Sequence, residues 1–370
     1  MKSYHQALET VSGSVDSFFK KAFDTVCINR PSIDFSTLKD KPIMIASSHR
    51  SQADYFLIGS LLNRMGIDNL RFAAGDNLTN LPIIGDKFKQ WGAFPVERHR
   101  ANNRSYILTL CNQVSSMLEQ DDNVIVFPEM GRSYSGKMLE MKQVIIGAAV
   151  LAQARNPEKT YLYLPCSISY EQLPELEYFD TLLKGKKMRA QENSFFKKAM
   201  GNINYFGADA VAFSKFIFAH RFGKRYGSVY VDVGEPVAIN DIVDLKALHN
   251  PKASNEFWAN RTAMKKISIE IYNRLLALYR IFPASIVAHI MNDHRAMKLS
   301  EIKPQISSVI EKLQAKKRNL QTIESLSEDD IIEDGIRVLS RMSAVKLRNM
   351  QAVIRKQFAV KYYAALLNVD

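Results

Sequence analysis

The stretch that decides the fold reads Pro42-Ile43-Met44-Ile45-Ala46-Ser47-Ser48-His49-Arg50-Ser51-Gln52-Ala53-Asp54. Its first five residues form an apolar run that predicts a buried strand, and the two serines predict the loop that leaves this strand. An apolar helix is expected next, from Tyr55, Phe56, Leu57, Ile58, Leu61, Leu62 and Met65. This order predicts a polar loop between a strand end and a helix start.

His49 and Asp54 are the two residues of this loop whose chemistry matters most. On a regular helix a separation of five residues is about 140° of rotation, so their side chains would point apart. They can meet if His49 lies in the loop and Asp54 lies in the first helical turn. A carboxylate then fixes the imidazole tautomer and stabilises the imidazolium, which is the arrangement of a general base. The pair alone fits a surface histidine and a capping aspartate equally well.

Three later segments share the pattern of an apolar run followed by special residues. They are Gly92-Ala93-Phe94-Pro95-Val96-Glu97-Arg98, Val124-Ile125-Val126-Phe127-Pro128-Glu129-Met130-Gly131-Arg132-Ser133 and Tyr161-Leu162-Tyr163-Leu164-Pro165-Cys166-Ser167-Ile168. Functional groups gather at the carboxyl ends of strands in α/β sheets. We therefore expect His49, Asp54, Glu129 and Arg132 to converge at one edge of a sheet.

The order and spacing of these segments resemble the blocks of the glycerolipid acyltransferases, and in particular those of the glycerol-3-phosphate acyltransferase branch. The segments that carry the resemblance are HRSQADYF (49–56), FAAGDNL (72–78), GAFPVER (92–98), FPEMGRSYSGK (127–137) and VYVDVGEP (229–236). The resemblance covers roughly residues 40 to 240. Several ordered blocks are more specific than any one of them.

Three positions depart from the pattern of that branch. Met130 stands where the family usually has glycine, and Val144 replaces a glycine that usually follows the lysine at Lys142. The pair Glu97-Arg98 resembles the acidic-arginine pair of the lysophosphatidate acyltransferases more than the two arginines of the glycerol-3-phosphate branch. These departures bear on which acceptor substrate the protein uses more than on the type of reaction.

The resemblance implies transfer of a fatty acyl group from a thioester of coenzyme A or acyl carrier protein to a hydroxyl. His49 is expected to take the hydroxyl proton and to return it to the leaving thiolate, with Asp54 orienting the ring. No cofactor is expected, because the thioester is a substrate. No metal is expected either, because the histidines and the three scattered cysteines show no ligand spacing.

The resemblance also implies a set of substrate-binding residues, namely Arg98, Glu129, Gly131, Arg132, Ser133 and Lys142. The two arginines match a phosphate with their guanidinium forks, and Lys142 adds a point charge. Glu129 is expected to accept a hydrogen bond from the second hydroxyl of the acyl acceptor. Gly131, which has no Cβ, is expected to let the backbone approach the substrate closely. The alternatives are a solvated or salt-bridged surface arginine beside Glu97 for Arg98, and a cap or turn for Ser133. For Glu129 the alternative is a structural carboxylate that holds Arg132 or the Gly131 turn.

A net charge of +12 and a pI of about 9.4 fit three kinds of partner, namely nucleic acid, an anionic membrane or anionic small molecules. Residues 184–225 hold ten Lys or Arg, two acids and eight aromatic residues, which is typical of a membrane-interface segment. No nucleic-acid-binding motif accompanies them, so no nucleic acid is expected. A last long helix over about 331–364 is predicted, with an arginine face that either lies on lipid or is solvated.

The membrane contact is expected to be peripheral, on the cytoplasmic face. The first ten residues lack the apolar core of a secretory signal. The longest smooth apolar helix candidate, residues 143–154, is too short to span a bilayer.

The predicted fold class is α/β, with a mostly parallel sheet flanked by helices. Strands are expected near 43–46, 71–74, 93–96, 124–127, 161–168 and 229–233, alternating with helices. The predicted domains are an N-terminal helical segment (1–38), an α/β acyltransferase domain (39–245) and a C-terminal helical region (246–370). A capped helix start is expected at Ser327, followed by Asp330.

Two function hypotheses of different classes follow. The first is acylation of glycerol-3-phosphate in phospholipid biosynthesis, and the same chemistry applies to lysophosphatidate, another lysophospholipid or dihydroxyacetone phosphate as acceptor. The second is a membrane-binding relative that keeps the fold without the reaction. The presence of His49, Asp54, Glu129 and Arg132 favours the first.

Overall fold

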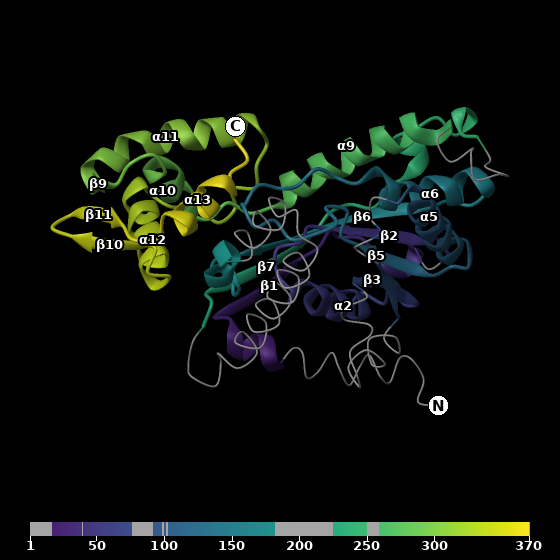
Figure 1. The fold of residues 1–370 in the computed structure, drawn as a ribbon, viewed down its shortest axis with the longest axis horizontal. Coiled ribbons are helices and arrows are strands. Elements are labelled where there is room, and N and C mark those ends of the chain that lie inside the picture. The colour runs from purple at the N-terminus through teal and green to yellow at the C-terminus, as the bar shows by residue number, and fades with distance from the viewer. Residues whose placement is uncertain are drawn as a thin grey trace, which may run out of the picture.

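The computed structural model describes residues 17–38, 40–75, 92–97, 100, 103–181, 225–249 and 259–369. Its centre is an eight-stranded sheet (Figure 1). The strands are β1 (Thr25–Asn29), β2 (Ile43–Ser47), β3 (Leu70–Gly75), β4 (Ala93–Val96), β5 (Asn123–Val126), β6 (Leu162–Tyr170), β7 (Ser228–Val233) and β8 (Val237–Ala238). The predicted strands are all present, and the predicted fold class is confirmed.

The strand order is β1-β7-β6-β2-β5-β3-β4, and β8 pairs with β6. The run from β6 to β4 is parallel, whereas β7 is antiparallel to β6 and carries β1 alongside it in parallel. The carboxyl ends of β2, β5 and β6 therefore lie at one edge. This is the edge at which α/β proteins place their functional groups.

The central strands β2, β5 and β6 are buried on both faces, which is why they read as apolar runs rather than as alternating patterns. Met44 and Ala46 face the helices α5 (Arg104–Glu119), α6 (Gln143–Arg155) and α9 (Arg261–Leu278). Ile43 and Ile45 face the opposite side, where α2 (Asp54–Arg64) packs. Figure 1 shows α9 running along the sheet beside α6, with α2 on the other side.

The C-terminal region packs helices around a small sheet. Its elements are α10 (Pro283–Met291), β9 (Ala296–Lys298), α11 (Leu299–Ala315), α12 (Glu328–Arg341), β10 (Val345–Arg348), β11 (Gln351–Ile354) and α13 (Gln357–Ala365). The small sheet has the order β10-β11-β9 and is antiparallel. Short 3-10 turns lie at Phe35–Leu38, Ile239–Asp241 and Leu245–Ala247.

The prediction of one long helix over 331–364 is wrong. The helix begins as expected with a capping box between Ser327 and Asp330, but it ends at Arg341. Ser343 then adopts a positive φ of 55°, and a hairpin follows whose turn residues Asn349 and Met350 have φ of 45° and 59°. Left-handed backbone at these positions cannot continue a right-handed helix.

Strand β1 is a second difference, because it lies inside the segment 1–38 that was predicted as helical. It pairs with β7 along its whole length, from Thr25 beside Ser228 to Asn29 beside Asp232. The run Thr-Val-Cys-Ile-Asn favours a strand through its β-branched residues. The helical spacing of Phe18, Phe19, Ala22 and Phe23 is confirmed only for residues 17–22.

Among the described helices, none combines the length and the apolar character needed to cross a membrane. The helix predicted over 143–154 is α6, and it is buried on nearly all sides. Most of the basic and aromatic segment at 184–225 lies outside the described residues.

Candidate active site

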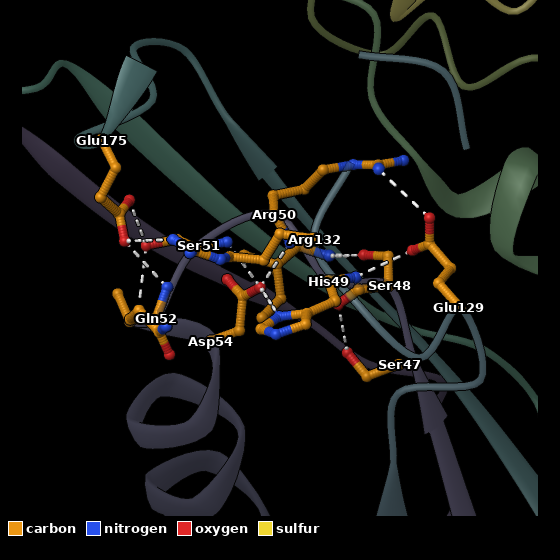
Figure 2. Close-up of polar contacts among 12 residues, drawn as sticks. Ser47, Ser48, His49, Arg50, Ser51, Gln52, Asp54, Glu129, Arg132 and Glu175 are labelled. Carbon is orange, nitrogen blue, oxygen red and sulfur yellow. Dashed lines mark hydrogen bonds and ion pairs between the residues drawn. The ribbon is translucent and has the colours of Figure 1, made fainter. Parts of the chain in front are cut away.

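Three loops meet at the carboxyl edge of the sheet. Residues 48–53 leave β2, residues 127–132 leave β5, and residues 171–175 leave β6. Figure 2 shows the side chains of these loops turned toward one another around the loop after β2. The predicted convergence of strand ends is therefore confirmed.

His49 and Asp54 are in contact, as the sequence predicts. His49 lies in the loop and Asp54 is the first residue of α2, so the two side chains approach from different elements. The His49 Nδ1 atom lies 3.0 Å from Asp54 Oδ2, and both residues are buried. Because a carboxylate can only accept, Nδ1 carries the proton and Nε2 is the nitrogen that can act as a base. The imidazole stacks on Phe127, with ring centroids 4.3 Å apart.

Asp54 is held by more donors than His49 alone. Its Oδ2 atom accepts the backbone N–H groups of Arg50 at 2.6 Å and Ser51 at 2.9 Å. Its Oδ1 atom accepts the Tyr170 hydroxyl at 2.6 Å, from the end of β6. These bonds fix the carboxylate and the loop together, so the imidazole meets a partner whose orientation is already set.

Glu129 is a buried carboxylate whose bonds in this structure go to the protein itself. Its Oε1 atom accepts the His49 backbone N–H at 3.0 Å. Its Oε2 atom accepts the Leu139 N–H at 2.8 Å and one Arg50 N–H at 3.3 Å. These contacts match the structural alternative, except that the arginine held is Arg50 rather than Arg132. Glu129 thereby joins the segment after β5 to the loop that carries His49.

Arg50 reaches from the loop after β2 to the segment that follows α9. Its guanidinium carbon lies 5.2 Å from the centre of the Tyr279 ring, which follows α9. Burial alone lowers the pKa of this guanidinium, but the negative charge of Glu129 raises it above its ordinary value. Arg50 therefore remains charged, and the pair with Glu129 compensates that charge in the interior.

Arg132 is buried against Glu175, with its Nη1 atom 3.6 Å from the carboxylate. Its guanidinium also lies 5.4 Å from the Tyr134 ring and 5.5 Å from the Phe179 ring. Glu175 in turn accepts the Ser51 hydroxyl at 2.7 Å and the Gln52 N–H at 2.9 Å. In this arrangement Arg132 braces the loop after β2 rather than facing the cavity beside His49.

That cavity has a volume of about 60 Å³. It is lined by His49, Tyr55, Ala73, Ala74, Val96, Val126, Phe127, Met130, Gly131 and Ile145. Apart from the histidine its walls are largely apolar, which suits a thioester better than a charged group. Ligand pockets are typically roughly 300–1,000 Å³, so this space admits a reacting group and not a whole acyl chain.

Met130 and Gly131 form the turn beside the cavity. Met130 has a φ of 51°, in the left-handed region that favours glycine. Met130, which replaces the usual glycine of the family pattern, therefore has a strained backbone conformation. A Cβ built on Gly131 meets no atom within 4 Å, so the space next to this residue is open.

Two of the remaining predicted residues, Ser133 and Lys142, make contacts of a different kind. Ser133 is fully buried, with its Oγ atom 3.5 Å from that of Ser135. Lys142 is exposed and precedes α6, where its N–H donates to the Pro128 carbonyl at 2.8 Å. Arg98 lies outside the described residues.

Tyr170, the last residue of β6, and Glu175, in the loop after it, were not predicted as site residues. A signal was present, because Tyr170, Glu171, Gln172 and Glu175 follow a buried strand that was predicted correctly. Polar residues at that point belong to the same edge as His49. Their partners, however, are more than a hundred residues away along the chain.

Comparison with known proteins agrees with the blocks. Residues 29–169 match the acyltransferase family, and residues 213–364 match the glycerol-3-phosphate acyltransferase C-terminal region. The glycerol-3-phosphate acyltransferase of Xanthomonas axonopodis pv. citri is 28% identical over 251 residues, which are 66% of this chain and 26% of that protein. That of Xanthomonas campestris pv. campestris is 31% identical over 214 residues, 58% of this chain and 22% of that protein.

A solved structure is also similar, that of the 1-acyl-sn-glycerophosphate (LPA) acyltransferase PlsC from Thermotoga maritima. Its TM-score is 0.37 at 16% identity, and the match covers 73% of this chain and 83% of that one. The chain spans about a quarter of the length of the curated relatives named above. Its two consecutive family matches thus identify an acyltransferase domain, followed by the C-terminal region of a glycerol-3-phosphate acyltransferase.

Proposed function

We propose that this protein transfers a fatty acyl group from a thioester to the hydroxyl of glycerol-3-phosphate. The observation that carries the proposal is the buried His49–Asp54 pair, 3.0 Å apart, on the wall of an apolar cavity at the sheet edge. The curated relatives with the name glycerol-3-phosphate acyltransferase support this acceptor. The donor is a thioester of coenzyme A or acyl carrier protein.

The reaction needs one base and one leaving group. His49 Nε2 removes the proton from the acceptor hydroxyl while the oxygen attacks the thioester carbonyl. The C–S bond then breaks, and the same proton returns to the thiolate, so that the histidine ends unchanged. Asp54 stabilises the transient imidazolium, since its carboxylate lies against Nδ1. No acyl-enzyme is needed.

The phosphate is the part of the acceptor that basic residues hold. Arg98 and the exposed Lys142 are the proposed phosphate ligands. Arg132 can join them only if its ion pair with Glu175 opens. The proposed role of Glu129 is to position His49, whose backbone N–H it accepts, rather than to bind a substrate hydroxyl.

An acceptor panel tests the function. Thiol release from palmitoyl-coenzyme A is followed with glycerol-3-phosphate, lysophosphatidate or dihydroxyacetone phosphate, and the lipid product is identified. Release that requires glycerol-3-phosphate and yields lysophosphatidate is expected. Release only with another acceptor would keep the chemistry and replace the acceptor. No release with any acceptor or with an acyl carrier protein donor would favour a non-catalytic relative.

A further inference from the structure

The hairpin of β10 and β11 carries two of the most exposed large apolar side chains in the described part of the protein. Leu347 is 43% exposed and Met350 is 67% exposed. Figure 1 shows the hairpin projecting at one end of the molecule, away from the large sheet. Two exposed apolar side chains on one projecting hairpin make it a candidate interaction surface.

The turn itself is built at an energetic cost. Asn349 and Met350 form its two central positions, and both have positive φ. Hairpin turns of this kind favour asparagine, aspartate or glycine at these positions. Asn349 fits that preference, because its short polar side chain can hydrogen-bond to the nearby backbone, whereas Met350 has no such group and is strained in left-handed backbone. A large apolar residue therefore occupies a turn position at which asparagine, aspartate or glycine would cause less backbone strain.

The strands next to the tip are basic. Leu347 lies on the same sheet face as the buried Val345 and Ala352, but beyond the edge of the core. The opposite face carries Lys346, Arg348 and Lys298, which are all exposed. These side chains make no ion pair among the described residues. The nearest acids along the chain, Asp293 and Glu301, flank β9, and Glu301 caps the Lys298 N–H.

The charge around the hairpin has one sign over a long stretch. From residue 335 to residue 369 the chain holds seven Lys or Arg and no acid, and of these Arg337 pairs with Asp334 just before the stretch. An edge strand with lysine and arginine also resists pairing with another strand. An apolar tip flanked by basic side chains is complementary to an anionic bilayer. The lipid phosphates attract the cations, and the apolar side chains insert into the acyl region.

We propose that the β10–β11 hairpin is a membrane-docking device that inserts Leu347 and Met350 into the interface of an anionic bilayer. Lys346, Arg348 and Lys298 contact lipid phosphates beside it. The inference does not depend on acyl transfer, because it concerns binding in the absence of any substrate.

The test is flotation of the full chain with vesicles of phosphatidylcholine containing 30% phosphatidylglycerol, compared with phosphatidylcholine alone. The double variant Leu347→Thr and Met350→Asn removes the apolar tip with residues that suit a strand and a left-handed turn. Its partition coefficient is expected to fall at least about tenfold. Ile269→Gln is the matched control, since Ile269 is 53% exposed on α9, and it is expected to bind like the wild type.

The charges are tested with Lys346→Gln and Arg348→Gln together, which are expected to weaken binding about tenfold at low salt. Wild-type binding that is equal on neutral and anionic vesicles, or absent on both, would overturn the proposal. So would wild-type affinity of the tip variant, which would assign binding to another segment. Self-association that only the tip variant loses, without vesicle binding, would assign the hairpin to contacts between copies.

Discussion

At the scale of single residues, the site depends on buried carboxylates that accept hydrogen bonds from other groups of the protein. Asp54 accepts hydrogen bonds from His49, Arg50, Ser51 and Tyr170, so the His49 ring is one of four groups that share this carboxylate. Glu129 and Glu175 brace the same loop from two other strand ends. The loop is therefore positioned by buried charge before any substrate arrives.

Met130 offers a direct test of backbone strain. Replacing Met130 by glycine removes a left-handed cost of about 1–2 kcal/mol and adds about 0.5–1 kcal/mol of chain entropy. We expect the free energy of unfolding to rise by about 0.5–1 kcal/mol in urea titrations. Met130→Ala keeps the strain and serves as the control. A glycine variant no more stable than the alanine variant would contradict the account.

Glu175 predicts a pH dependence of stability. Burial raises the pKa of its carboxyl, against the lowering effects of the Arg132 charge and of the bonds from Gln52 and Ser51. Between the unfolded-state pKa of about 4.3 and the raised native value, the native protein holds a proton that the unfolded chain has released. The contribution of Glu175 to stability is therefore complete below that window and is lost as the pH rises through it.

The variant Glu175→Gln isolates this contribution, because glutamine cannot titrate. The stability of the wild type relative to this variant is expected to fall as the pH is raised from 4 through the raised native pKa. Urea unfolding of both proteins at a series of pH values measures the difference. A difference that stays constant, or that grows with pH, would show that Glu175 is not proton-linked in this way.

At the scale of elements, the central strands β2, β5 and β6 could be predicted because they are buried on both faces and bounded by polar loops. Strand β1 and the β10–β11 hairpin could not, since each depends on a partner distant in sequence or on a left-handed turn. Distance along the chain also decides which contacts of the site could be predicted. The His49–Asp54 contact is local, whereas Arg50 with Glu129 and Arg132 with Glu175 are long-range pairings.

Helix α12 gives a prediction at this scale. The Ser327 hydroxyl accepts the Asp330 N–H at 3.2 Å, and Asp330 accepts the Ser327 N–H at 3.0 Å. Ser327→Ala is expected to lower the unfolding free energy by about 1 kcal/mol, because one helix donor loses its partner. Thermal or urea unfolding measures it. Ser300→Ala, an exposed serine in the first turn of α11, is the control, and an equal effect of both would refute the cap.

At the scale of the whole molecule, one buried ion pair ties β7 to the segment between α9 and α10. Arg280 donates two hydrogen bonds to Asp232, each of 2.8 Å. Its guanidinium also lies 4.4 Å from the Tyr230 ring. The pair joins the large sheet to the chain that leads into the C-terminal region.

Breaking this pair from one side is expected to be costly. Asp232→Ala leaves the Arg280 charge buried and should lower the unfolding free energy by about 3–5 kcal/mol. The double variant Asp232→Ala with Arg280→Met should recover much of that loss, since no charge remains buried. Asp329→Ala, which breaks an exposed pair with Lys303, should change stability little. A double variant as unstable as the single one would contradict this role.

The acyl transfer itself is the central claim, and His49 is the residue on which it depends. The most direct measurement is the rate of thiol release from palmitoyl-coenzyme A with glycerol-3-phosphate, for the wild type, His49→Ala and His294→Ala. Loss of the base should lower the rate by about 10²–10⁴-fold, whereas the exposed His294 should be replaceable within about twofold. A folded His49→Ala variant that releases thiol at the wild-type rate would contradict the account.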